Sequence, residues 1–392
     1  MTDRMQRILT ACWADRLGTG SYPSTQPSPE QVAKLSKVSE IVAAQWGDLL
    51  PQIIPDATPA AVATYIDKIA RGRMALFTSI AVESDDLERL SALSSFIGLI
   101  YVVDWLLDAD DKDMGRALEA FLGDVQVQAA LQSTAQGGLS PIPQAVYARS
   151  AATTAPDAPM PALTVSERRR LLALTTMHDI IKKGTRPEDQ PWLLGSPLLG
   201  ILLLARETAK LSLAYLNADD QQAFWRQHAR TLADSSINST SILAFAATAY
   251  AVYRIADPAL PPLSAIYHEP VLRDDFGPLV NTVVRVYDDF NDRAIDREHA
   301  TFAMNIFNDP HPAFVNEFLR QAGLTQEDTA LKITAALQSG SEEDALAVLE
   351  FFKDLKCSRF KSVCERIPPE YHRYTIILAR MIENTYAGRF AM

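Results

Sequence analysis

The chain has 392 residues, with 37 Lys and Arg against 48 Asp and Glu, which gives a formal net charge of −11. Because 48% of the residues are hydrophobic and 22% are charged, the composition excludes a disordered chain. The negative charge argues against a protein that binds nucleic acid by neutralising phosphates. The three cysteines include no CxxC pair, so neither a disulfide framework nor a structural zinc site is expected.

Apolar residues recur at helical spacing along most of the chain, whereas the period-2 alternation of strands is scarce. We predict an all-α protein with helices at 30–49, 59–80, 87–108, 115–133, 164–183, 197–216, 219–255, 271–298, 327–337, 342–356 and 369–386. Pro29 has the position of a first helical residue, and the sequences that begin at Thr164 and Ser341 resemble capping boxes.

The segment around 132–163 is rich in Ala, Ser, Thr, Pro and Gly. Because helices of the same character continue on both sides, we interpret it as a loop insertion in a single α-helical domain that covers 1–392. The first residues lack the apolar run of a secretory signal, and the longest apolar stretches are shorter than the roughly 20 residues that span a bilayer. We therefore expect a cytoplasmic protein without stable membrane insertion, and homodimer formation stays open.

The first informative motif is an apolar helix that runs directly into acidic residues, FIGLIYVVDWLLDADDKD, from Phe96 to Asp113. If the helix continues, Asp104, Asp108 and Asp111 lie within about 60° of one another. The simplest alternative is a polar helix end in solvent. Asp104 argues against it, because its apolar neighbours predict partial burial, and a buried carboxylate needs a cation or hydrogen-bond donors.

The second motif places Asp288, Asp292 and Asp296 at i, i+4 and i+8, within about 80° on one helical face. Like charges at this spacing repel one another, and Arg285 is placed to pair with Asp288 or Asp289. The alternative is a charged, solvent-exposed face. The apolar residues that precede the row, 279–287, favour instead a central helix.

Two acidic rows on central helices would surround a shared cavity if the helices face each other. Hard divalent cations relieve the resulting repulsion, and Mg²⁺ suits such a site because it combines a few carboxylates with water and substrate phosphates. The sequence lacks the Glu-x-x-His pairs of di-iron proteins, which disfavours that metal centre.

With Arg373-Tyr374 near the C-terminus, these motifs resemble those of class I terpene synthases. Asp104-Trp105-Leu106-Leu107-Asp108 resembles the first metal motif of that family, and Asp288, Asp292 and Asp296 resemble the second. The all-aspartate second motif is also similar to that of the large bacterial terpene synthases and, more loosely, of squalene and phytoene synthases.

The resemblance implies a helical bundle around a central cavity, three Mg²⁺ ions and a linear prenyl diphosphate substrate, farnesyl or geranylgeranyl diphosphate. Ionisation and cyclisation would release diphosphate without any catalytic side chain beyond the metal cluster. The implied metal ligands are Asp104, Asp108, Asp111, Asp288, Asp292 and Asp296. The candidate diphosphate ligands are Arg373, Tyr374, Arg285 and Arg230, with Arg254 as a further candidate. The candidate pocket residues are Phe96, Tyr101, Trp105, Phe245, Tyr253 and Tyr287.

Two other functions stay open at this point. One is a prenyltransferase or a head-to-head condensing enzyme of the squalene and phytoene synthase kind. The other is a non-catalytic helical interaction protein whose acidic faces are solvated.

Overall fold

The computed structural model describes residues 29–71, 85–108, 111–122, 162–190, 210–211, 213–239, 250, 254, 257–297, 305–308, 310–324, 327–372 and 375. Every regular element within these ranges is a helix and none is a strand, which confirms the predicted all-α class. Nearly all of the expected insertion, up to residue 161, lies outside the described residues, and the single domain stays a prediction. No helix in the described part is long and apolar enough to cross a bilayer.

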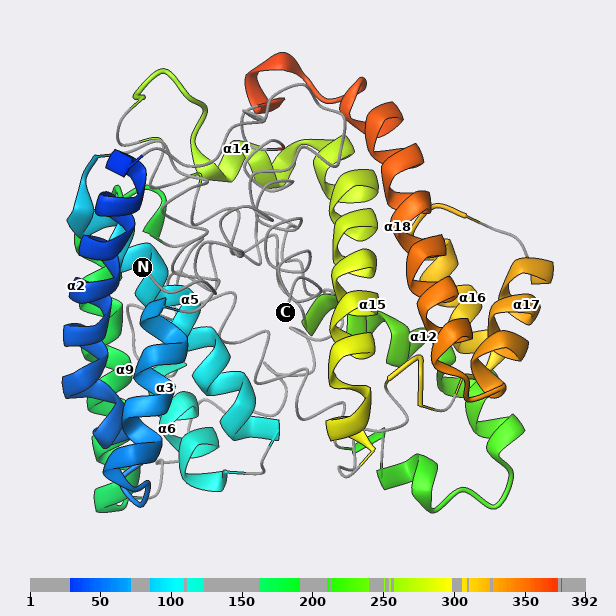
Figure 1. The fold of residues 1–392 in the computed structure, drawn as a ribbon, viewed down its shortest axis with the longest axis horizontal. Helices are drawn as coiled ribbons and strands as arrows, with labels where there is room; N and C mark the ends of the chain where they lie inside the picture. The colour runs from blue at the N-terminus through cyan, green and yellow to red at the C-terminus, as the bar shows by residue number, and fades with distance from the viewer. Residues whose placement is uncertain are drawn as a thin grey trace.

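Five helices pack together on one side of the molecule, at the left of Figure 1. They are α2 (Pro29–Ile53), α3 (Pro59–Arg71), α5 (Leu87–Asp108), α6 (Lys112–Leu122) and α9 (Val165–Lys183). α2 packs against α3, α5 and α9, and α6 packs against α5 and α9. α5 is therefore covered by the other four helices, which explains why its sequence is apolar on every side.

A second group lies on the other side of the molecule (Figure 1). Its long helices are α12 (Gln221–Ser239), α15 (Gly277–Asp296), α16 (Pro312–Gln321), α17 (Glu327–Gln338) and α18 (Glu342–Cys364). Three short elements complete it: α14 (Leu263–His268), the π-helical turn η1 (Leu272–Phe276) and the 3₁₀ turn η3 (Pro369–Tyr371). Buried hydrophobic residues of both groups belong to one core cluster.

Several helix ends follow the predicted local signals. α2 begins at Pro29, and the Thr164 side chain caps α9 in a capping box with Glu167. α5 has the predicted bounds, 87–108. The helix expected over 271–298 instead opens with η1, because Pro278 has no backbone N–H to continue an α-helical ladder back into the preceding turn.

Close packing of α2 and α3 against α5 depends on Gly98. A Cβ atom at this position would lie 2.6 Å from Ile69 Cγ2 and 3.2 Å from Trp46 Cζ2. Trp46 and the neighbouring Phe96 are fully buried. The absence of a side chain at Gly98 thus lets the three helices share one dense core.

Two polar clusters lie at the two ends of α9 and connect it to neighbouring helices. Near the start of α9, Arg170 reaches the end of α2 and Asp111, just after the end of α5. Beyond the other end of α9, Asp189 accepts a hydrogen bond from the Leu263 amide at the start of α14. α15 follows α14 and runs back, so the C-terminal ends of α5 and α15 lie toward the same end of the molecule, each on the side of its group that faces the other group (Figure 1).

Candidate functional site

The acidic row on α15 is half-buried. Asp288, Asp292 and Asp296 all lie on the described part of this helix, and none of the three is fully exposed. The Arg285 guanidinium pairs with two neighbouring carboxylates, at 3.6 Å from Asp288 Oδ2 (Nη1) and 2.6 Å from Asp289 Oδ1 (Nε). The predicted pairing of Arg285 is thereby confirmed, and the row is partly neutralised from within its own helix.

Asp289, the neighbour of Asp288 on α15, is a buried carboxylate, with 1% of its surface exposed. Its Oδ2 accepts a hydrogen bond of 3.0 Å from the Ile306 amide. Burial raises the pKa of Asp289 to about 8, and Arg285 and the Ile306 amide oppose that rise. Asp289 therefore anchors the turn at 305–308 against the inner side of α15.

Asn305 fastens the same turn to the end of the acidic row. Its Nδ2 donates hydrogen bonds of 2.7 Å to the Asp289 carbonyl and 2.8 Å to Asp296 Oδ2. Its Oδ1 accepts one of 2.9 Å from the Phe307 amide, and the residue is completely buried. The sequence analysis missed Asn305, because nothing local shows that the chain returns to α15 nine residues after Asp296.

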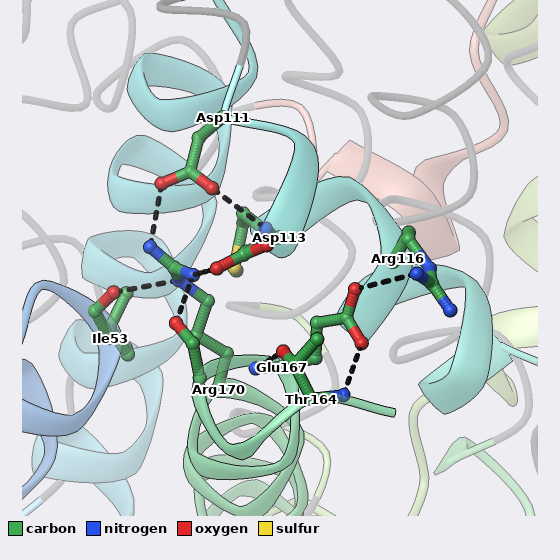
Figure 2. Close-up of polar contacts among 9 residues, drawn as sticks. Ile53, Asp111, Asp113, Arg116, Thr164, Glu167 and Arg170 are labelled. Carbon is green, nitrogen blue, oxygen red and sulfur yellow. Dashed lines mark hydrogen bonds and ion pairs between the residues drawn. The ribbon is translucent and has the colours of Figure 1, made fainter. Parts of the chain in front are cut away.

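On α5, the structure changes the geometry expected for the first motif. The helix ends at Asp108, so Asp111 does not extend its face. Asp111 instead caps the start of α6: its Oδ1 accepts a hydrogen bond of 2.9 Å from the Met114 amide, and its Oδ2 lies 2.8 Å from Arg170 Nη2 (Figure 2). The side chains of Asp104 and Asp108 lie outside the described residues.

The donor chemistry of this region fits Mg²⁺. Half-buried carboxylates at i, i+4 supply oxygen ligands, and Mg²⁺ usually takes only one or two protein carboxylates before water and substrate phosphates complete its shell. Among the described residues, no three His, Cys, Asp or Glu side chains come together as a metal site. The side chains of Asp104 and Asp108, which lie outside the described residues, are not covered by this statement.

The candidate cations for a diphosphate occupy different surroundings. Arg230 has 74% of its side chain exposed and lies 3.8 Å from Asp234, on the outer side of α12. Arg254 is buried, and its Nη1 lies 2.5 Å from Asp189 Oδ1. Burial raises the pKa of Asp189, while Arg254 and the Leu263 amide lower it, so Arg254 already has a dedicated partner. Arg373 and Tyr374 lie outside the described residues.

The candidate pocket residues also differ in how deeply they are buried. Phe96 is fully buried and Tyr287 is 7% exposed, whereas 37% of Tyr101 is exposed. The side chain of Trp105 and all of Phe245 and Tyr253 lie outside the described residues.

Comparison with known proteins leaves the family open. No protein-family model matches the chain, and no curated protein matches it. Two solved structures, both variants of the SVS_A2 protein from ancestral sequence reconstruction, are 16% identical to it, with TM-scores of 0.45 and 0.44. Each match covers 93% of this chain and 85% of the solved chain. A likeness at this level establishes neither a shared fold nor a shared function.

Proposed function

We propose that the protein is a magnesium-dependent terpene synthase that ionises a linear prenyl diphosphate and cyclises the resulting carbocation with release of diphosphate. Farnesyl and geranylgeranyl diphosphate are the proposed substrates. The fold that we propose for the protein is a helical bundle of the class I terpenoid synthase kind, arranged around a central cavity. Its metal ligands are Asp104 and Asp108 on α5 and the acidic row on α15.

One observation carries the proposal more than any other. α5 and α15 carry the two predicted acidic motifs at their C-terminal halves, and these halves lie toward the same end of the molecule, on facing sides of the two helix groups (Figure 1). A helix C-terminus carries partial negative charge, which makes it an unfavourable place for carboxylates unless cations are bound there. Two such ends at the same end of the molecule favour a shared cation site.

Bound Mg²⁺ would supply positive charge to the departing diphosphate. The carboxylates of α15 would orient the diphosphate through that charge, and Arg285, which spans Asp288 and Asp289, would limit the repulsion within the row. Arg373 and Tyr374 are the proposed direct ligands of diphosphate oxygens. The carbocation needs an apolar, water-free surrounding, to which buried aromatic rings such as Phe96 and Tyr287 would contribute.

A non-catalytic role also has one observation in its favour. Protein partners already hold several of the acidic residues, as Arg285 holds Asp289, Asn305 holds Asp296 and Arg170 holds Asp111. A helical interaction protein needs no more than this. Its acidic residues would then be replaceable by their amides without loss of any metal-dependent property.

The deciding experiment incubates the protein with prenyl diphosphates of ten, fifteen, twenty and twenty-five carbons, with and without Mg²⁺. We expect Mg²⁺-dependent release of diphosphate and formation of hydrocarbon from the fifteen- or twenty-carbon substrate. Asp104→Asn and Asp288→Asn should each lower turnover at least about a hundredfold with the fold intact. Glu88→Gln, at the exposed start of α5, is the matched control and should retain wild-type turnover.

Two outcomes would contradict the proposal. If none of the substrates releases diphosphate, the protein is not an enzyme of this kind. If diphosphate is released only in the presence of isopentenyl diphosphate or a second prenyl chain, with a longer product, the prenyltransferase or condensing reaction replaces the cyclase.

A further inference from the structure

Arg170 of α9 joins three helices at the end of the molecule where α5 terminates. Only 7% of its side chain is exposed. Nε donates a hydrogen bond of 2.9 Å to the Ile53 carbonyl at the end of α2, and Nη1 donates one of 2.8 Å to Ser166 Oγ. Nη2 lies 2.8 Å from Asp111 Oδ2, and Nη1 lies 2.9 Å from Asp113 Oδ2 (Figure 2). One guanidinium therefore ties α2 and α9 to the start of α6.

Asp111 transmits this contact to α5. Its amide donates a hydrogen bond of 2.9 Å to the Leu106 carbonyl in the last turn of α5, while its Oδ1 caps α6 through the Met114 amide. Its Oδ2 is the oxygen that meets Arg170. Because both carboxylate oxygens and the backbone amide have protein partners, the orientation of the last turn of α5 depends on Asp111 and, through it, on Arg170.

A second ion pair joins the same helices without touching this turn. Arg116 of α6 lies 3.1 Å from Glu167 of α9, and Glu167 also completes the capping box with Thr164 (Figure 2). Arg116 is 40% exposed in its side chain, whereas Glu167 is buried. This pair connects α6 to α9 in the same place, so it provides a natural control for a role specific to Arg170.

We propose that Arg170 is a positioning residue for the metal site, and that Asp111 serves the α5–α6 turn instead of binding metal. This inference rests on the proposed function. Recruitment of Asp111 to a metal ion would remove a partner from a nearly buried guanidinium, which is unfavourable. The metal-binding capacity of the first motif is then supplied by Asp104 and Asp108, in the helix whose last turn Arg170 fixes.

The test uses the full chain and Mn²⁺ alone as the probe, with binding followed by the EPR signal of the free ion. Asp111→Asn removes the carboxylate charge but keeps one oxygen, which can still cap α6 through the Met114 amide. Arg170 then retains its contacts with the Ile53 carbonyl, Ser166 and Asp113. Asp108→Asn removes a proposed metal ligand. We expect Asp111→Asn to bind Mn²⁺ with a Kd within about threefold of wild type and Asp108→Asn to raise the Kd at least about tenfold.

Arg170→Met tests the positioning role. We expect the Kd for Mn²⁺ to rise about tenfold in protein that circular dichroism shows to be folded. Arg170→Lys retains the charge, but its single ammonium cannot reach all four partners of the guanidinium, so its Kd should lie between those of wild type and Arg170→Met. It replaces Arg170→Met if that variant does not fold. Arg116→Ala should lower the thermal midpoint and leave the Kd unchanged.

The outcomes separate this inference from the proposed function. If Asp111→Asn loses Mn²⁺ as Asp108→Asn does, the assignment of Asp111 is wrong. If folded Arg170 variants bind Mn²⁺ like wild type, Arg170 is a structural residue only. If wild-type protein binds no Mn²⁺, the proposed function fails together with this inference. If it binds Mn²⁺ with the expected variant pattern but releases no diphosphate, the positioning role stands and the enzyme does not.

Discussion

Asn305→Leu should destabilise the protein by about 2–4 kcal/mol. The substitution fills a similar volume but removes three hydrogen bonds, to the Asp289 carbonyl, Asp296 Oδ2 and the Phe307 amide. Asp296 is half-buried and can recover water, whereas the two backbone groups belong to buried residues. The buried Phe307 amide loses its partner, which costs about 1–3 kcal/mol. The Asp289 carbonyl keeps its place in the α15 ladder and loses only a second hydrogen bond, which adds about 1 kcal/mol and gives the stated total.

Thermal and urea unfolding measure this effect. In a chain of this size, about 2–4 kcal/mol should lower the thermal midpoint by roughly 2–5 °C. The control is Asn217→Leu, since the Asn217 side chain is exposed and donates its hydrogen bond to the Leu213 carbonyl, four residues earlier. Asn305→Asp should be worse than Asn305→Leu, because it places a carboxylate against Asp296 and the Asp289 carbonyl. A midpoint for Asn305→Leu within 1 °C of wild type would refute the described link.

Gly98→Ala should destabilise the protein by about 1–3 kcal/mol through overpacking. Gly47→Ala, with nothing within 4 Å of the added Cβ, should stabilise it by up to about 1 kcal/mol. Equal effects of the two substitutions in urea unfolding would contradict this reasoning. Arg254→Met should cost about 3–5 kcal/mol at pH 8, because it leaves Asp189 buried without a cation. Burial then raises the folded-state pKa of Asp189 above its unfolded value, so stability is lost as pH rises and the deficit should shrink at pH 5; a deficit that grows at pH 5 would be inconsistent with it. Burial raises the pKa of Cys364 to about 11, so its alkylation at pH 8, followed by peptide mass spectrometry, should be about a hundredfold slower than that of a free thiol; labelling at the rate of free cysteine would contradict the burial.

The parts of the fold that local chemistry decides could be predicted from the sequence. The bounds of α5 follow from an apolar run that ends in acids, and the start of α9 follows from the spacing of Thr164 and Glu167. The pairing of Arg285 with Asp289 follows from i, i+4 geometry within one helix. In each case the deciding residues lie within one or two helical turns of one another.

Other features depend on contacts that spacing does not reveal. α16 was missed because Pro310 and Pro312 resemble a helix break, yet Pro312 opens the helix and the His311 Nδ1 accepts a hydrogen bond from the Ala313 amide. The helical face assumed for Asp111 was wrong because α5 ends at Asp108.

The partners of Asp111 and Asp296 also could not be predicted from local sequence spacing. Arg170 follows Asp111 by 59 residues, and Asn305 follows Asp296 after a return of the chain to α15. Only the folded arrangement shows which acids already have protein partners, and this distinction separates structural carboxylates from candidate metal ligands.

The central claim is that α5 and α15 share one magnesium cluster that binds a diphosphate. A crystal structure of the protein with Mn²⁺ and inorganic diphosphate, in which anomalous scattering locates the metal, tests it most directly. The account predicts Mn²⁺ about 2.0–2.3 Å from carboxylate oxygens of both helices, with the diphosphate completing the shell. Mn²⁺ on only one of the helices, or carboxylates of Asp104 and Asp288 more than about 15 Å apart, would contradict it.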